Sequence, residues 1–154
     1  MAKKRAAKTP PSQIVMFRGE LAFLSNFYPA KTIYEGIEYK TAEHAFQAAK
    51  SIDEKDRLYI KSAATPGDAK RMGYAIKLRE DWSKVKLQIM KDCLKSKFTL
   101  NPSLRKKLLD TGELELVDTN FWKDDFWGKC TEAGQNHLGK LLMEVRQEIK
   151  EGKY

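Results

Sequence analysis

The sequence predicts a mainly α-helical fold, a single multihelical domain with a small β-hairpin element near the N-terminus. From Thr41 onward, apolar residues recur in several segments at the spacing of one helix face. Before that point, two short runs rich in Ile and Tyr flank Glu35-Gly36, which indicates a tight hairpin turn. The 154 residues show no internal repeat, and a chain of this length can bury one core without disulfide or metal staples.

The first elements are expected before Thr41. Residues 1–13 have no apolar periodicity and are predicted to be a disordered basic tail, followed by one domain over residues 14–152. The apolar run Ile14 to Phe17 is typical of a short strand. The stretch LSNFYP, residues 24–29, has the composition of a sharp corner, because Pro29 lacks an N–H donor and biases Tyr28 toward extended backbone.

The helices follow one another with few interruptions. Thr41 is a suitable N-cap, and Thr65 is followed by Pro66 and Asp68, the pattern of a capped helix start. Asn136 is expected to cap the last helix. The predicted helices cover residues 41–49, 54–63, 65–72, 81–98, 101–112 and 136–152, with a short strand at 114–117. Residues 118–135 show neither a helical nor a strand period.

Charge and composition limit the functional classes. The formal net charge is +8, and about +3 is left when five basic residues are set aside: Lys3, Lys4, Arg5, Lys8 and Arg18. We interpret this basic start either as a solubilising tail or as a nonspecific contact for nucleic acid. No apolar run approaches the roughly 18 residues that span a bilayer, and no signal peptide is recognisable. The two cysteines suit a reducing cytoplasm, so a cytoplasmic protein is expected.

Two segments could carry chemistry. In YKTAEHAFQAAK, residues 39–50, Glu43, Gln47 and Lys50 share one helix face. The alternative for Glu43 is an ordinary acid favoured by the helix N-terminus, and a lone His44 is more often structural than catalytic.

The second segment, FWKDDFWGKC, spans residues 121–130 and holds two Trp, two Phe and two Asp without regular structure. Its rings suit stacking on a planar ligand such as a base, and the alternative is a satellite hydrophobic cluster that pins a long loop. The chain lacks a P-loop, a dinucleotide fingerprint, zinc-ligand spacing and a nucleophile elbow. Metal-assisted hydrolysis and nucleotide-driven transfer are therefore disfavoured.

Together these motifs resemble the NADAR, or YbiA-like, N-glycosidase family. The motifs that carry the resemblance are LSNFYP (24–29), YKTAEHAFQAAK (39–50), AKRMG (69–73), DWSKVKLQIM (81–90), KF (97–98), DDFWG (124–128) and GQNHLGKLLMEVR (134–146). They span nearly everything from Phe17 to Ile149. The resemblance implies a single, mainly helical domain that hydrolyses an N-glycosidic bond with no metal and no organic cofactor.

The resemblance also implies a set of site residues. It places the catalytic acids on Glu43 and Asp124, with Asp125 as an immediate competitor for the second position. Asn26 would hydrogen-bond the ribose or base edge, and its alternative is a turn-stabilising Asx hydrogen bond. The residues expected to bind substrate are Asn26, Phe27, Lys50, Trp82, Asp125, Phe126, Trp127, Gly128 and Asn136.

Members of the resembled family act on two sorts of substrate. Some cleave ribosylamino-pyrimidine phosphates of early riboflavin biosynthesis, and others remove ADP-ribose from modified bases, including guanine in DNA. The basic balance of this chain favours ADP-ribosylated nucleic acid over a ribosyl-phosphate small molecule. A third hypothesis is a non-catalytic module that binds ADP-ribose or nucleic acid, and the retention of both Glu43 and Asp124 speaks against it.

Overall fold

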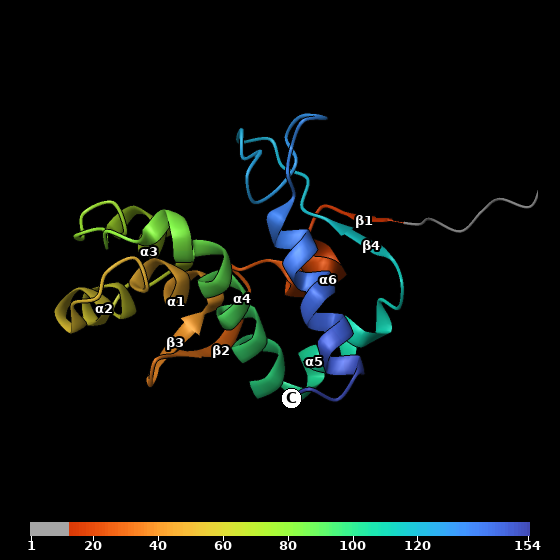
Figure 1. Cartoon of the computed structure of the whole chain (residues 1–154), viewed down its shortest axis with the longest axis horizontal. Helices are drawn as coiled ribbons and strands as arrows, with labels where there is room; N and C mark the ends of the chain where they lie inside the picture. The colour runs from red at the N-terminus through yellow and green to blue at the C-terminus, as the bar shows by residue number, and fades with distance from the viewer. Residues whose placement is uncertain (1–12) are drawn as a thin grey trace, which may run out of the picture.

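A computed structural model describes residues 13–154 and contains two small sheets among seven helices, one of them 3-10 (Figure 1). In chain order the elements are β1 (Gln13–Val15), η1 (Gly19–Leu24), β2 (Pro29–Tyr34), β3 (Ile37–Thr41), α1 (Ala42–Ala48), α2 (Glu54–Lys61), α3 (Pro66–Met72), α4 (Trp82–Leu100), α5 (Pro102–Asp110), β4 (Glu115–Val117) and α6 (His137–Lys150). The mainly helical class and its small hairpin are confirmed. The predicted tail lies outside the described residues except for Gln13, the first residue of β1.

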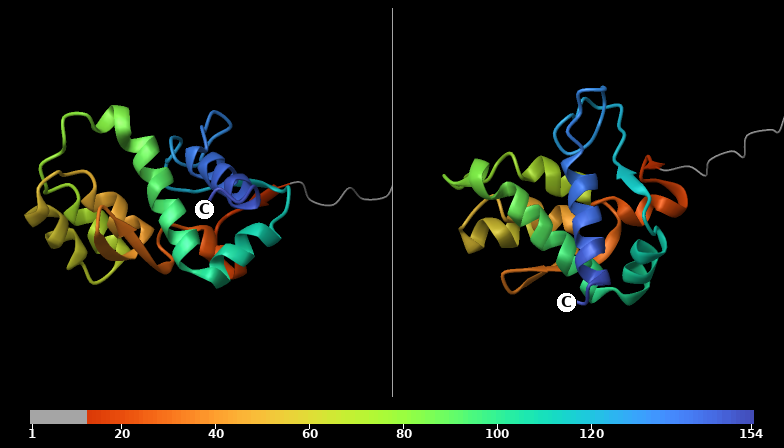
Figure 2. Two further views of the ribbon diagram at one scale, coloured as in Figure 1. Left: turned by 60° about the horizontal axis from the view of Figure 1, so that its bottom comes forward. Right: turned by 45° about the vertical axis from the view of Figure 1, so that its right-hand side comes forward.

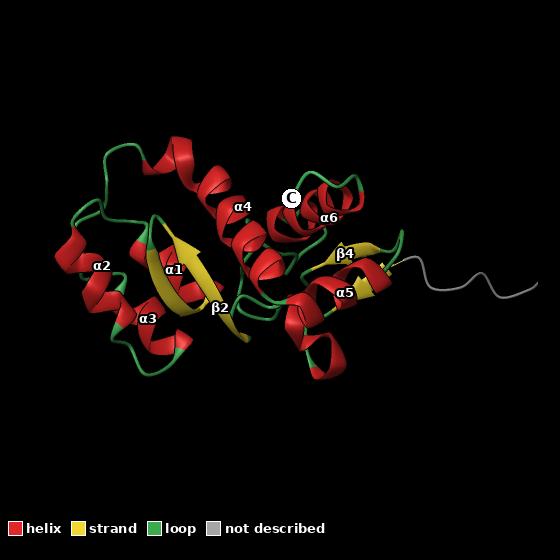
Figure 3. Ribbon diagram, turned by 90° about the horizontal axis from the view of Figure 1, so that it is seen from below, coloured by secondary structure: helices red, strands yellow, loops and turns green. Residues whose placement is uncertain are grey.

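The long helix α4 runs through the middle of the fold. It packs against β2, α1, α5 and α6. Figure 3 shows the hairpin with α1, α2 and α3 on one side of α4, and α5, α6 and β4 on the other. The predicted apolar stripe of α4 buries Ile89, Met90, Cys93 and Leu94, which join the core common to both sides.

Helix α1 is buried around its whole circumference. All seven of its residues are buried, although the sequence pattern indicated only one inward face. It contacts α2, α3, α4 and both hairpin strands. The small side chains of Ala42, Ala45 and Ala48 allow these neighbours to approach closely. The polar side chains of α1 therefore lie inside the protein and need partners there.

The hairpin forms as the sequence predicts. β2 and β3 pair antiparallel, with Tyr34 opposite Ile37. Glu35 and Gly36 join them with φ values of 44° and 82°. Two positive φ values in a two-residue loop are the mark of a type I′ turn, whose twist matches that of the flanking strands.

A second sheet ties the start of the domain to its C-terminal half. β1 pairs parallel with β4, with Val15 opposite Val117. The sequence predicted both strands but not their pairing, because nothing local relates segments about one hundred residues apart. Because the two strands are parallel, residues 16–18, which follow β1, lie beside the start of the irregular segment that follows β4.

The predicted helix caps hold at two positions and fail at a third. The Thr41 and Thr65 side chains accept hydrogen bonds from His44 N and Asp68 N. Asn136 occupies the predicted N-cap position of α6, but it has φ 52° and its side chain makes no cap hydrogen bond. Side-chain capping fails because the Asn136 side chain bonds the end of β4 instead, donating to Leu116 O at 2.9 Å and accepting from Asp118 N at 3.0 Å.

Two findings bear on the expected environment of the protein. Over residues 13–154, no helix has both the length and the apolar character that crossing a membrane requires. Cys93 and Cys130 are free thiols. A cytoplasmic location stays a prediction.

Candidate active site

A cavity of about 690 Å³ lies where the N-terminal segment, α1, the α3 region and the loop between β4 and α6 meet. Its volume is typical of small-molecule sites. In the right-hand view of Figure 2, the β4–α6 loop projects beyond the helices, so this wall of the cavity is built from irregular chain. The cavity is lined by Met16, Phe17, Arg18, Ser25, Asn26, Phe27, Glu43, Phe46, Gln47, Lys50, Gly67, Lys70, Tyr74, Met90, Asp118, Thr119, Phe121, Trp122, Asp124, Trp127 and Leu138.

The structure brings Glu43 and Asp124 to this one cavity, although they come from an early helix and a late loop. Four of the residues expected to bind substrate also line it: Asn26, Phe27, Lys50 and Trp127. Five expected residues are not part of the lining: Trp82, Asp125, Phe126, Gly128 and Asn136.

Glu43 is a buried carboxylate, with 7% of its surface exposed. Burial raises the pKa of Glu43, which the Gln47 hydrogen bond and the charges of Lys70 and Lys50 partly oppose. Gln47 Nε2 donates to Glu43 Oε1 at 2.8 Å, as the shared helix face predicts. The result is a carboxyl group that takes up a proton more readily than an exposed glutamate.

Gly73 leaves room for the Gln47 side chain. A Cβ atom at Gly73 would collide with Gln47 Oε1, so only glycine lets the end of α3 approach this closely. The space left by Gly73 accommodates the Gln47 amide that bonds Glu43. The sequence contains Gly73 in the motif AKRMG but gave no hint of this contact, which joins two separate helices.

The corner at residues 24–29 presents Asn26 to the cavity. The Asx turn considered from the sequence is not formed: Asn26 Nδ2 lies 3.3 Å from Met90 Sδ, and Oδ1 is buried without a partner among the described residues. The turn is instead closed by Ser25, whose Oγ accepts from Phe27 N at 3.2 Å. The backbone of the corner is also fixed to α1, since Glu43 N donates to Asn26 O at 3.0 Å.

A buried lysine supports this corner from α4. Lys97 is fully buried, and its Nζ donates to Ser25 O at 2.8 Å. Burial lowers the pKa of Lys97 to about 7. The sequence placed Lys97 in a family motif without a role, and the structure shows that it holds the corner backbone.

Asn120 and Asp124 order the first part of the β4–α6 loop. Asn120 Oδ1 accepts from Trp122 N at 3.2 Å and Asp124 N at 3.1 Å, and its Nδ2 donates to Asp124 O at 2.7 Å. Asp124 Oδ1 accepts from Phe126 N at 3.2 Å and Trp127 N at 2.9 Å. These side chains provide the partners that a strand or helix would otherwise give to the backbone. They also fix the Asp124 carboxylate at the cavity wall.

The neighbouring Asp125 has a different environment. Its Oδ1 accepts from Cys130 N and Thr131 N, both at 2.8 Å, and its Oδ2 accepts from Thr131 Oγ1 at 2.8 Å. The Thr131 hydrogen bonds lower the pKa of Asp125. Asp125 therefore closes residues 125–131 into a turn outside the cavity. Gly128 lies within this turn, and a Cβ at this position would collide with Asp118 O.

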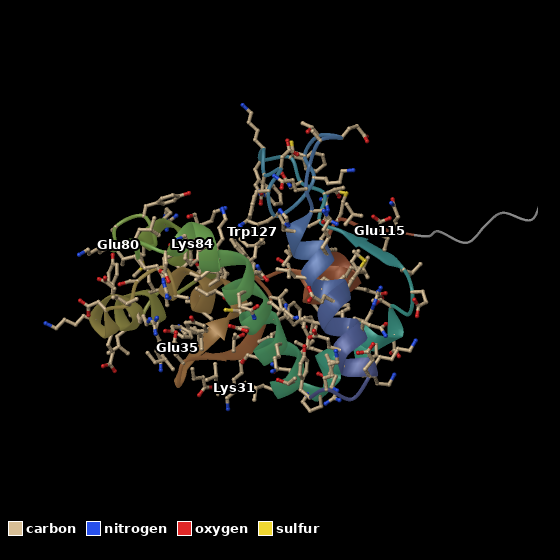
Figure 4. All side chains as sticks on the ribbon, in the orientation of Figure 1. Lys31, Glu35, Glu80, Lys84, Glu115 and Trp127 are labelled. Carbon is tan, nitrogen blue, oxygen red and sulfur yellow. The ribbon has the colours of Figure 1, made fainter. Side chains whose placement is uncertain are left out.

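Packing between aromatic rings accounts for the positions of Trp82, Phe126 and Trp127. The Phe46 ring lies 5.1 Å from Trp82 and 5.3 Å from Trp127, and Phe126 stands at 4.8 Å from Trp127, edge to face. Figure 4 labels Trp127 at the place where the loop descends toward α4. Of the two predicted tryptophans, only Trp127 lines the cavity; Phe126 packs against Trp127, and Trp82 packs against Phe46.

Several lining residues were missed by the sequence analysis. Arg18, Lys70 and Asp118 add charge to the cavity. Burial, with a further contribution from the Asp124 charge, raises the pKa of Asp118 to about 6. The available signals were weak: Asp118 directly follows the predicted strand, and Lys70 lies in the AKRMG motif.

Unpartnered polar atoms gather at this cavity. Four buried side-chain polar atoms lack a hydrogen-bond partner over residues 13–154, and three belong to lining residues: Asn26, Gln47 and Thr119. Buried polar groups are nearly always bonded, so such a concentration indicates a surface that is completed by a ligand. Within the same described range, no group of three or more His, Cys, Asp or Glu could hold a metal ion.

Comparison with known proteins identifies the family of this chain. Residues 16–150 match the NADAR domain. The chain belongs to the NADAR family. An N-glycosidase of Nostoc punctiforme is 42% identical over 132 residues, which cover 82% of this chain and 84% of that protein. The N-glycosidase YbiA of Escherichia coli K12 is 39% identical over 128 residues, covering 81% and 79%.

Two further similarities concern structure and pathway. The NMR structure of Escherichia coli YbiA superposes with a TM-score of 0.82 at 34% identity, over 94% of this chain and 89% of that one. A riboflavin biosynthesis protein of Vibrio vulnificus is 35% identical over 132 residues, which cover 84% of this chain but only 36% of that protein. The predicted NADAR membership and fold are confirmed.

Asp118→Asn is expected to stabilise the protein at neutral pH. Because the pKa of Asp118 is about 6 in the folded protein and lower in the unfolded chain, the folded state binds the extra proton between these values. Stability contributed by this group therefore falls as pH rises through that window and is not regained above it. The amide removes this loss, so thermal unfolding should show a larger gain in Tm at about pH 7.5 than at about pH 4.5.

The control is Asp110→Asn, which changes an exposed aspartate on α5. It should shift Tm by a similar small amount at both pH values. A gain for Asp118→Asn that does not depend on pH would contradict the raised pKa of this carboxyl.

Proposed function

We propose that the protein hydrolyses the N-glycosidic bond of an ADP-ribosylated nucleobase and releases ADP-ribose from guanine in DNA. The reaction class, hydrolysis of an N-glycosyl bond, is that of the N-glycosidases to which this NADAR chain is similar. The observation that carries the proposal is the meeting of Glu43 and Asp124 in one cavity with cationic and aromatic walls.

The chemistry requires two kinds of help at the bond that breaks. Positive charge builds on the anomeric carbon as the base leaves, and a carboxylate can stabilise this charge or activate the attacking water. The departing base must receive a proton or hydrogen bonds. Glu43, whose buried carboxyl has a raised pKa, serves as the principal acid/base, and Asp124 serves as the second acid.

The walls position the sugar and base. Asn26 Oδ1 is an unpartnered acceptor in a residue that is 8% exposed, and it accepts a hydrogen bond from a ribose hydroxyl or the base edge. The half-buried Trp127 offers a ring on which a planar base can stack. The Glu43 backbone N–H donates to the Asn26 carbonyl oxygen, and this hydrogen bond fixes the position of the acid relative to the binding group.

Three cations support a substrate with more than one phosphate. Arg18, Lys50 and Lys70 all line the cavity. A diphosphate such as that of ADP-ribose offers them two anionic groups, whereas a ribosyl monophosphate offers one. The alternative is hydrolysis of ribosylamino-pyrimidine phosphates, favoured by the similarity to the Vibrio vulnificus riboflavin biosynthesis protein. A non-catalytic binding module is the second alternative.

Glu43→Gln is expected to lower kcat on the order of a hundredfold or more, because it keeps the shape and the Gln47 contact but removes the titratable proton. Tm at neutral pH should not fall, since the substitution also removes a buried acid. Steady-state kinetics and thermal unfolding measure the two effects. Glu38→Gln, at an exposed position of β3, is the control. Turnover by Glu43→Gln at the parent rate would mean that Glu43 is not the acid/base.

Asp124 and Asp125 can be separated by the same substitution. Asp124→Asn keeps an oxygen for the Phe126 and Trp127 amides but removes the charge at the cavity, so kcat should fall on the order of a hundredfold. Asp125→Asn acts outside the cavity and should change kcat by no more than about threefold. Steady-state kinetics give both kcat values, and the reverse ranking would assign the second acid to Asp125.

The substrate is identified by direct comparison. Purified protein is incubated with DNA that carries ADP-ribosylated guanine and, separately, with ribosylamino-pyrimidine phosphates, and products are analysed by mass spectrometry. We expect release of ADP-ribose, with a rate that falls steeply as salt rises, because a polyanionic substrate displaces counterions. Deletion of residues 1–12 should weaken only the DNA reaction. Turnover of the pyrimidine phosphates alone would favour the alternative.

A further inference from the structure

The aromatic residues of the β4–α6 loop fall into two groups with opposite environments. Phe126 and Trp127 pack with Phe46 and against each other, as a structural cluster would. Phe121 and Trp122 are 78% and 63% exposed, yet both line the cavity. Burial of a protein core does not account for the second pair, because these rings remain largely in water.

Exposed rings also come from other parts of the chain. Five aromatic side chains are exposed over residues 13–154, and four of them line the cavity: Phe27, Tyr74, Phe121 and Trp122. The fifth, Tyr59 on α2, does not. We call these four residues the aromatic rim. Large exposed apolar groups gathered at one place mark a binding surface.

The aromatic rim is interleaved with cations. The Arg18 guanidinium lies 5.8 Å from the Phe121 ring centroid, and Lys50 Nζ lies 5.7 Å from that of Tyr74. Arg18 and Lys70 are exposed, whereas Glu43 is buried and the two aspartates of the cavity are partly buried. Positive charge therefore lies toward the mouth and negative charge toward the interior.

Rings alternating with cations are the pattern of single-stranded nucleic-acid binding, in which bases stack on the rings and phosphates meet the cations. We propose that the aromatic rim binds unpaired bases next to the reacting nucleotide, so that the substrate is a single strand. The identity of the reacting base rests on the proposed function, but the rim itself binds unmodified strand. A paired duplex keeps its bases stacked inside the helix and cannot use these rings.

The rim has two separated parts, which favours a strand over one nucleotide. Tyr74 follows α3, and Phe121 and Trp122 belong to the loop before α6. In Figure 1 these two segments stand apart, with the chain after α3 at the left and the β4–α6 loop at the top. Each part lies beside a cation, Lys50 at Tyr74 and Arg18 at Phe121, and these cations can meet strand phosphates when no ADP-ribose occupies the cavity. A chain that enters on one side and leaves on the other can contact both parts.

The test measures binding without turnover. A fluorescein-labelled, unmodified single-stranded oligonucleotide is titrated with the full chain, and anisotropy gives Kd. Replacement of one stacking ring by alanine should weaken binding by about 5- to 150-fold, the range for loss of one stacked base. This applies to Trp122→Ala and to Tyr74→Ala on the other side of the mouth. The matched control, Tyr59→Ala, removes an exposed ring away from the cavity and should bind as the parent does.

Further arms distinguish the occupants of the rim. A duplex of the same sequence should bind more weakly than the strand, and Trp122→Ala should weaken binding of the strand more than binding of ADP-ribose alone. Unchanged oligonucleotide binding by the rim variants would overturn the proposal. So would a loss confined to ADP-ribose, which would place its adenine on the rim. No bond is cleaved in this binding test, so its result does not depend on whether the protein catalyses the proposed reaction. Conversely, catalysis of that reaction would not support the rim proposal if the rim variants still bound the strand normally.

Discussion

The burial of Glu43 is the constraint on which the site depends. Taking a carboxyl group out of water favours its protonated form and costs stability at neutral pH. Helix α1 tolerates this because its alanines allow close packing on every side and because Gln47 hydrogen-bonds the carboxyl group. Gly73 in turn leaves room for Gln47. The alanines and Gln47 suit a helix in any case, whereas the burial of Glu43 costs stability and becomes useful only because a cavity forms beside it.

The hydrogen bonds of the corner explain why Asn26 has a free acceptor. Ser25 closes the corner through its own oxygen atoms, Lys97 binds its carbonyl, and the Asn26 carbonyl takes the Glu43 amide. The backbone of the corner is thus satisfied without the Asn26 side chain. A turn that relied on an Asx hydrogen bond would have used the oxygen that the cavity now presents. Holding the corner from α4 requires the buried position of Lys97, where its pKa is about 7.

The sequence predicted the features that local spacing determines and missed those that depend on distant contacts. The helix period placed Glu43 and Gln47 on one face, and turn chemistry placed Glu35-Gly36 in the hairpin. The sequence could not show that α1 is buried on all sides, because that burial depends on packing against five other elements. Asn136 had the right residue type for a cap, but its side chain is taken by β4. In the irregular loop, composition alone could not separate packed rings from exposed ones.

The charge of Asp124 acts on the two other carboxyl groups of the cavity, and this bears on the reaction. Burial is the main cause of the raised pKa values of Glu43 and Asp118, and the negative charge of Asp124 raises both further. Without substrate, repulsion from Asp124 therefore disfavours ionisation of Glu43 and Asp118. A sugar that acquires positive charge relieves this repulsion, whereas a neutral sugar does not. The empty site is for that reason less well matched to the ground state than to the transition state of glycosidic cleavage, which is the difference that accelerates a reaction.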